Sequence, residues 1–239
     1  GLEQNLLVQF EELNEKKAVS DIRITVNKEK AYLKENDEVP DVSVWNKLCN
    51  LRQYDLQFYE ILIGNIVKGE KTEYAPNGFK VYERIESSEK IRKLVSLSAQ
   101  DRVITTNLAL RLCSRMQTTW KSFSYHVSYT SQDRIFYYWY SSWGRFIDHI
   151  KVFTEIPFMD NYEAFYIDLK GFYDHIDFLA VFRAFGDLLD EETKNIFVFL
   201  TEFNDKLMKQ LQNGCRIGVP QGPAYARIIA EMFLDRLLE

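Results

Sequence analysis

The spacing of hydrophobic positions predicts a largely helical chain. Leu6, Leu7, Phe10 and Leu13 fall on one helical face near the N-terminus. The same spacing of three and four predicts helices from residue 41 or 43 to 51, over 56–66, 101–116 and 178–189, over 191–211, and after residue 222. Asp41 or Ser43 would cap the second of these helices, because short polar side chains accept hydrogen bonds from the first free N–H groups.

Three shorter runs predict strands. Phe79 to Ile85 and Ile91 to Leu97 are rich in β-forming residues and flank a short polar segment, which predicts an antiparallel hairpin. Ala164 to Leu169 is mostly apolar, as is typical of a buried strand, and carries Asp168 almost at its end. An aspartate at the tip of a strand is suited to holding a divalent cation. The predicted fold class is therefore α+β, helix-rich with a small antiparallel sheet.

Aromatic residues are concentrated between Phe123 and Phe146, with an unbroken run from Phe136 to Tyr140. Exposed rings stack on unpaired bases, at about 1–3 kcal/mol each. Consecutive rings, however, point around every side of a helix, so we expect most of this run to pack in the core. Lys151 to Asp160 is expected to be a connection without regular structure.

Composition narrows the functional classes. The 239 residues suffice for one or two domains, and 46% are hydrophobic, so a core can form. The formal net charge of −5 opposes a simple nucleic-acid binder. Residues 84–121 nevertheless hold eight basic and three acidic side chains, with Arg102, Arg111 and Arg115 on one predicted helix. This segment is either a basic track that steers a polyanion or an ordinary solvated surface.

Cysteine and histidine usage gives no metal or disulfide pattern. Cys49, Cys113 and Cys215 are odd in number and lack a C-x-x-C pair, which opposes a zinc site and fits a reducing cytoplasm. The three histidines have no ligand spacing and are expected to be structural. No apolar run approaches the ~20 residues of a membrane span. We therefore expect a cytoplasmic location and no membrane partner.

The segment from Tyr166 to Phe178 reads Tyr-Ile-Asp-Leu-Lys-Gly-Phe-Tyr-Asp-His-Ile-Asp-Phe. It resembles motif A of the bacterial reverse transcriptases. The segment from Ile217 to Asp235 opens with Ile-Gly-Val-Pro-Gln-Gly-Pro and continues as an amphipathic helix, which resembles motif B. The two motifs occur in the order of the family and are separated by a helical span, as in that family. The resemblance therefore implies the fingers and part of the palm of a right-hand polymerase.

A third segment fits the same family. Lys90 to Leu97, Lys-Ile-Arg-Lys-Leu-Val-Ser-Leu, resembles the basic strand of the fingers, from which an arginine holds the incoming triphosphate. A guanidinium suits this role because its planar fork binds two phosphate oxygens. Arg92 is the first choice, with Lys93 or Lys90 second. The predicted helix that follows resembles the one whose basic residues lie along the template backbone.

The resemblance implies two-metal nucleotidyl transfer with Mg²⁺, or Mn²⁺, acting on dNTPs along an RNA template and a DNA primer or product. Asp168 matches the catalytic metal ligand, and the Leu169 carbonyl is a further ligand in the family. Asp174 and Asp177 are expected to be solvated caps. The matching nucleotide-binding residues are Lys90, Arg92, Lys93, Gly171, Phe172, Tyr173, Gln221 and Gly222. Tyr173 occupies the position of the aromatic steric gate, which excludes a ribose 2′-hydroxyl.

The sequence departs from the family in two places. Ala226 and Glu231 stand where intron and retron enzymes have Ser and Asn or Ser, so motif B is nearer to abortive-infection and other defence-associated members. The family's third signature, (Y/F)-x-D-D, does not follow before Glu239. We therefore expect that this chain does not polymerise alone.

Three functions stay open: templated DNA synthesis in phage defence or a mobile element, untemplated DNA synthesis, and a non-catalytic scaffold that binds nucleic acid or a partner. The predicted domains are a helical finger extension over 1–78, fingers with the basic hairpin over 79–160, and a partial palm over 161–239.

Overall fold

The computed structural model describes residues 2–35, 41–87, 90–116, 122–123, 126–155, 163, 165–211 and 217–238. The helices are α1 Leu2–Ser20, α2 Ile22–Glu35, α3 Val42–Cys49, α4 Gln53–Val67, α5 Ala99–Met116, α6 Trp139–Thr154, α7 Phe172–His175, α8 Phe178–Phe185, α9 Glu191–Leu211 and α10 Ala224–Leu237. A 3₁₀ turn, η2 Gly186–Leu188, follows α8. The strands are β1 Phe79–Ser87 and β2 Lys90–Leu97.

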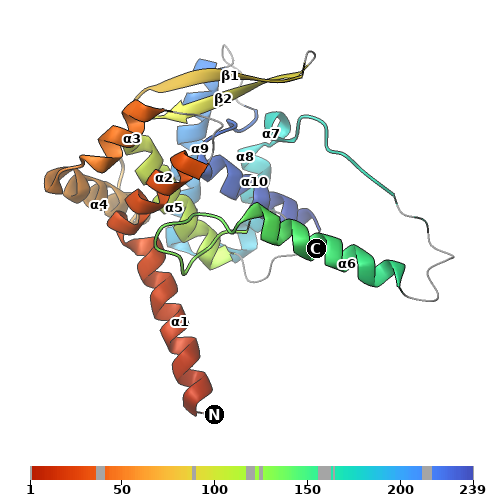
Figure 1. Ribbon diagram of the computed structural model, residues 1–239. Coiled ribbons are helices and arrows are strands. Elements are labelled where there is room, and N and C mark those ends of the chain that lie inside the picture. The colour runs from red at the N-terminus through yellow and green to blue at the C-terminus, as the bar shows by residue number, and fades with distance from the viewer. Residues whose placement is uncertain are drawn as a thin grey trace.

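Helix α5 is the centre of the molecule. It packs against α1, α2, α3, α4, α9, α10 and β2 (Figure 1). One cluster of buried hydrophobic residues extends from Val19 in α1 to Met232 in α10. It therefore passes through all three predicted domain ranges, and the domain boundaries themselves stay a prediction.

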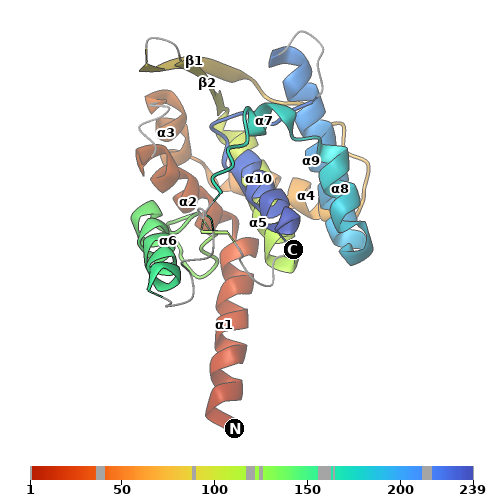
Figure 2. The same cartoon turned by 90° about the vertical axis from the view of Figure 1, so that its right-hand side faces the viewer.

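The two strands pair antiparallel, with Phe79 opposite Leu97 and Ile85 opposite Ile91, as the sequence predicted. This ribbon lies across one end of the helical body (Figure 2). Val95 and Leu97, at the inner end of β2, are buried in the core, whereas Ile91 at the outer end is exposed. The described part of the fold is thus α+β and helix-rich with a small antiparallel sheet, as expected.

Most predicted helices are confirmed within a few residues of their expected ends. Asp41 caps α3 as expected, because its carboxylate accepts the backbone N–H of Val44. Helix α9 begins and ends where the periodicity placed it. Among the described residues, no helix has the length and apolar character needed to cross a membrane.

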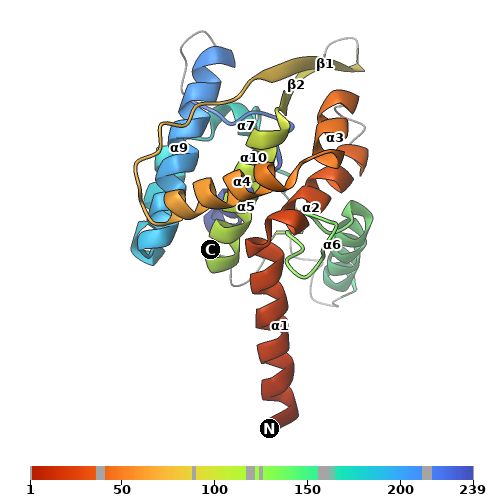
Figure 3. The same ribbon diagram turned by 90° about the vertical axis from the view of Figure 1, so that its left-hand side faces the viewer.

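Two helices extend away from this body. Helix α1 projects from it with Leu6, Phe10 and Leu13 exposed (Figure 3), so the predicted apolar face exists but is not covered by a described element. Helix α6 also projects (Figure 1). The prediction that the aromatic run packs in the core is wrong for most of its residues: Phe136 is buried, but residues 137–140 are exposed. Lys151 also belongs to α6 rather than to an irregular connection; residues 156–160 of that connection lie outside the described chain.

The predicted strand from Ala164 to Leu169 is also wrong. Residues 165–169 have no regular structure, and Phe165, Tyr166 and Ile167 are more than 80% exposed; Ala164 lies outside the described residues. A strand forms by hydrogen bonding to a neighbouring strand, and the sheet found in the described chain contains β1 and β2 alone. An apolar run therefore did not suffice to make a strand here.

Candidate active site

A cleft of about 900 Å³ lies between the β1–β2 ribbon, the segment around α7 and the start of α10. Every residue that the resemblance assigned to a nucleotide or metal site lines it: Lys90, Arg92, Lys93, Asp168, Leu169, Gly171, Phe172, Tyr173, Gln221 and Gly222. These residues come from three separate parts of the sequence. A second cavity, of about 750 Å³ between α1, α5 and α9, is lined by none of them.

The floor of the cleft is formed where the motif A and motif B segments meet. Gly171 has a left-handed backbone with φ of 62° and precedes α7. The backbone N–H of Val219 donates to the carbonyl of Tyr173 over 2.8 Å, and that of Gly218 donates to the carbonyl of Ile176 over 2.9 Å. Gly218 has φ of 102°, and a Cβ there would lie 3.0 Å from the Asp174 carbonyl oxygen. Glycine is therefore required for this close approach.

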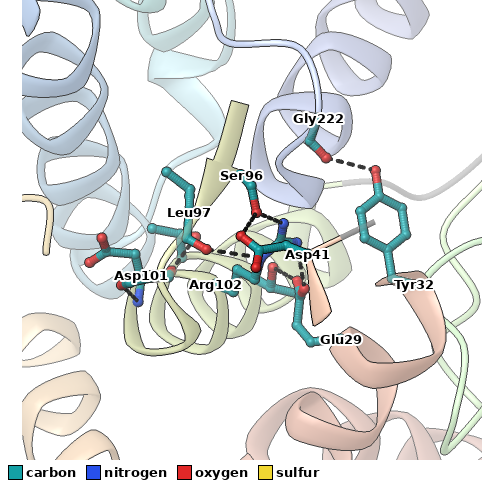
Figure 4. A network of polar contacts seen from close by, with 11 residues as sticks. Glu29, Tyr32, Asp41, Ser96, Leu97, Asp101, Arg102 and Gly222 are labelled. Carbon is teal, nitrogen blue, oxygen red and sulfur yellow. Dashed lines mark hydrogen bonds and ion pairs between the residues drawn. The ribbon is translucent and has the colours of Figure 1, made fainter. Parts of the chain in front are cut away.

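A second junction joins the motif B loop to the ribbon. The backbone N–H of Val95 donates to the carbonyl of Gln221 over 2.8 Å. Gly222 has φ of 117°, and a Cβ there would lie only 2.5 Å from the Val95 carbonyl oxygen. The hydroxyl of Tyr32, from α2, donates to the Gly222 carbonyl over 3.0 Å (Figure 4). The loop is thus held by β2 on one side and by α2 on the other.

A buried polar network fixes the inner end of β2 (Figure 4). Arg102 of α5 forms an ion pair with Glu29 of α2 over 3.3 Å and donates to the Ser96 hydroxyl over 2.9 Å. Ser96 in turn donates to the Asp41 carboxylate over 3.3 Å. Burial raises the pKa of Glu29, although Arg102 and Thr106 oppose the shift. The ribbon is therefore fastened to α2, α3 and α5.

The same network corrects one expectation. Arg102 was expected to lie along a template backbone, but it is 2% exposed and paired with Glu29. Arg115 is also occupied, because it pairs with Asp190 and Glu192. The basic segment of the sequence therefore does not form a continuous track along α5.

Positive charge gathers in the cleft instead. Its described lining holds five basic side chains (Lys90, Arg92, Lys93, Lys170 and Arg227) and two acidic ones (Asp168 and Asp174). The cleft is thus net positive in a chain of net charge −5. A concave positive surface attracts anions such as phosphates.

The ribbon presents its basic residues on both faces. Since residues alternate along a strand, Lys93 shares a face with Val95, and Arg92 lies on the other. Glu86 pairs with both Arg92, over 2.8 Å, and Lys90, over 3.2 Å. A carboxylate of this chain therefore pairs with two of the three side chains that the sequence offered for a triphosphate, the third being Lys93.

Tyr173 is partly enclosed. Burial raises its pKa to about 12, although the positive charge of Arg227 acts in the opposite direction. The hydroxyl is therefore protonated at neutral pH. Its ring lies edge-on to Phe172, with centroids 6.0 Å apart.

Asp168 lies on the exposed segment at the edge of this cleft and forms no hydrogen bond or ion pair with another described residue. In the described part of the chain, no group of three or more His, Cys, Asp or Glu residues is arranged to hold a metal ion. Asp168 and Asp174 line the same cleft. Magnesium takes one or two carboxylates and completes its coordination with substrate phosphates and water, so the exposed Asp168 carboxylate is of the kind that such an ion takes.

Sequence reasoning did not assign Tyr32 or Arg227 to the cleft, although both line it. Tyr32 carried no signal, because it lies 190 positions from the glycine that it contacts. Arg227 follows the Pro-Gln-Gly-Pro segment by a helical turn, so its place on α10 was predictable but its direction was not. Asp174 was expected to be a solvated cap; it is exposed in the first turn of α7, whose N-cap is Gly171, and it also borders the cleft.

Comparison of this chain with protein-family models, with curated proteins and with solved structures finds no match. The residues of the cleft and their geometry therefore carry what can be inferred about function.

Proposed function

We propose that this chain forms the nucleotide-binding fingers and partial palm of a reverse-transcriptase-type DNA polymerase. One observation carries the proposal. The residues picked out by three separate sequence segments line a single, positively charged cleft. Sequence separation alone gives no reason for these segments to meet, so their convergence supports a shared site.

In this proposal, Lys90, Arg92 and Lys93 bind the triphosphate of a dNTP from the ribbon side. Gly171 and Phe172 offer backbone N–H groups from the opposite side, and Gln221 lies beside the nucleotide. Tyr173 limits the space beneath the sugar. The side chain of Asp168, with the carbonyl of Leu169, would hold Mg²⁺. The cation, when bound, supplies charge neutralisation for the phosphates and activation of the primer 3′-oxygen.

The test is equilibrium binding of each dNTP to this chain in Mg²⁺, measured by calorimetry. Arg92→Gln and Lys93→Gln should each weaken binding by about tenfold or more, because each removes a charge-assisted bond. Arg23→Gln is the matched control, since Arg23 is exposed on α2 and does not line the cleft. Absence of binding at about 1 mM dNTP, the upper end of ordinary Michaelis constants, would contradict the proposal.

Two further variants sharpen this test. Glu86→Gln should strengthen dNTP binding, because it removes the carboxylate that competes for Arg92 and Lys90. Asp168→Asn should remove the Mg²⁺-dependent part of the affinity, whereas Asp177→Asn should leave it intact. Asp177 is the N-cap of α8 and outside the cleft. Asparagine caps a helix as well as aspartate does.

The same variants distinguish a polymerase from a scaffold. A scaffold that binds nucleic acid without catalysis predicts that Mg²⁺ and Asp168→Asn have no effect on nucleotide affinity. Templated and untemplated synthesis are separated by primer extension with the longest natural form of the protein, with and without added template.

A further inference from the structure

Tyr32 brings the N-terminal region of the chain into the cleft. It lies on α2 and borders the cavity next to Tyr173 and Arg227. Its hydroxyl donates to the carbonyl of Gly222, and its ring lies 5.9 Å from that of Phe136. These two contacts fix both ends of the Tyr32 side chain.

Arg227 approaches the same place from α10. Its guanidinium lies over the Phe136 ring, 5.4 Å from the centroid, and Arg227 lines the same cleft as Tyr173. Phe136 is therefore a shared support for Tyr32 and Arg227. Both long side chains pack on this one buried ring.

The motif B loop transmits the Tyr32 contact to Tyr173. Tyr32 holds the carbonyl of Gly222 at one end of the segment 219–222, and the N–H of Val219 at the other end holds the carbonyl of Tyr173. Tyr32 thus acts on the backbone of Tyr173 through four residues. Arg227 lies near enough to the Tyr173 hydroxyl for its charge to act against the rise of the Tyr173 pKa that burial causes.

We propose that Tyr32 and Arg227 are positioning residues that fix the ring of Tyr173, so that α2 controls how strongly the cleft rejects ribonucleotides. This inference rests on the proposed function, in which Tyr173 lies beneath the sugar. A ring excludes one hydroxyl group only if it cannot tilt away from it. In this proposal, the loop that Tyr32 holds restrains the backbone of Tyr173, and Arg227, which packs on Phe136, restrains its side chain.

The test compares the affinities of a dNTP and of the rNTP with the same base, in Mg²⁺, by calorimetry. Tyr32→Phe keeps the ring on Phe136 and removes only the hydroxyl. The readout is the ratio of the dNTP and rNTP affinities rather than either affinity alone, and this ratio should fall by about fivefold to tenfold, the worth of one hydrogen bond. Arg227→Met also removes one of the basic side chains of the cleft, so it should weaken binding of both nucleotides and lower the ratio of the dNTP and rNTP affinities as well. Arg227→Lys keeps the charge and should recover part of both losses.

Tyr129→Phe is the matched control. Tyr129 donates to the Cys113 sulfur in the core and does not line the cleft. A merely structural loss would move the thermal midpoint and both affinities together, and would not change their ratio.

Each outcome decides the inference. If the wild-type chain discriminates and both Tyr32→Phe and Arg227→Met preserve the ratio, the inference is overturned and the proposed function stands. If the wild-type chain binds both nucleotides equally, Tyr173 is not a gate and the inference is overturned. If it binds neither, the proposed function fails and the inference fails with it. Should Tyr32→Phe not fold, Arg227→Met alone decides.

Discussion

Helices α5 and α6 show opposite relations between composition and burial. Helix α5 is the less hydrophobic of the two, yet 14 of its 18 residues are buried. Helix α6 carries two tryptophans and two phenylalanines, and Ser142 is the one buried residue among its 16. Helix α5 has described packing partners on every side, whereas no described helix or strand packs extensively on α6. Position in the topology, rather than hydrophobicity, decides burial here.

The polar residues of α5 are tolerated in the core because each has a partner. Thr106 donates to Glu29, Asp101 accepts from Tyr74 over 2.6 Å, and Asn107 donates to Thr25 over 2.9 Å. A buried polar group costs little when hydrogen-bonded and much when it is not. Substitutions in the two helices should therefore differ sharply in effect.

The largest effect is expected for Arg102→Met. It leaves the buried Glu29 carboxylate without its ion-pair partner, which should lower the free energy of unfolding by about 3–5 kcal/mol. Urea denaturation measures the loss. The double variant Glu29→Met with Arg102→Met should recover most of it; a double variant as unstable as Arg102→Met alone would show that the cost lies elsewhere.

Thr106→Val should cost less. It removes one donor to Glu29 but keeps the shape of the side chain and the Arg102 pair, so we expect a loss of about 1–3 kcal/mol in the same denaturation experiment. Thr154→Val, at the exposed end of α6, is the matched control, because its hydroxyl bonds only a neighbouring carbonyl. Equal losses for the two variants would contradict the comparison.

The protonation of Glu29 should make a measurable contribution to how the free energy of unfolding varies with pH. Because burial raises its pKa, the folded chain binds this proton more tightly than the unfolded chain does. The stability of the wild type relative to Glu29→Gln is then greatest below about pH 4.5 and falls as the pH rises through the folded-state pKa. Denaturation of both proteins across this range measures the difference; a difference that rises with pH would indicate a lowered pKa.

The smallest effect is expected on α6. Trp139→Ser and Trp143→Ser, whose side chains are 60% and 56% exposed, should each change the free energy of unfolding by less than about 0.5 kcal/mol. Urea denaturation followed by circular dichroism measures this without relying on tryptophan fluorescence. A loss above about 1 kcal/mol would show that these rings are packed in solution.

The sequence predicted well what depends on local periodicity. Helices α5 and α9 and the β1–β2 ribbon follow from spacing, and Asp41 from its capping chemistry. The residues proposed for the cleft were predicted from the resemblance to reverse-transcriptase motifs, not from periodicity or capping. The exposed rings of α6 and the irregular segment at Asp168 were not predicted, because burial and strand pairing depend on neighbours distant in sequence. The role of Tyr32 in the cleft could not be predicted for the same reason.

The hydrogen bond between Tyr32 and Gly222 also bears on how the site forms in time. A contact between residues 190 positions apart forms late in folding. The long intervening chain must lose conformational entropy before the contact can stabilise it. During synthesis, most helices that pack around α5 are already made before α10 leaves the ribosome. The cleft is still incomplete at that stage, because part of its lining comes from the start of α10 and the loop before it. Binding at this cleft would therefore report that nearly the whole described chain has completed folding.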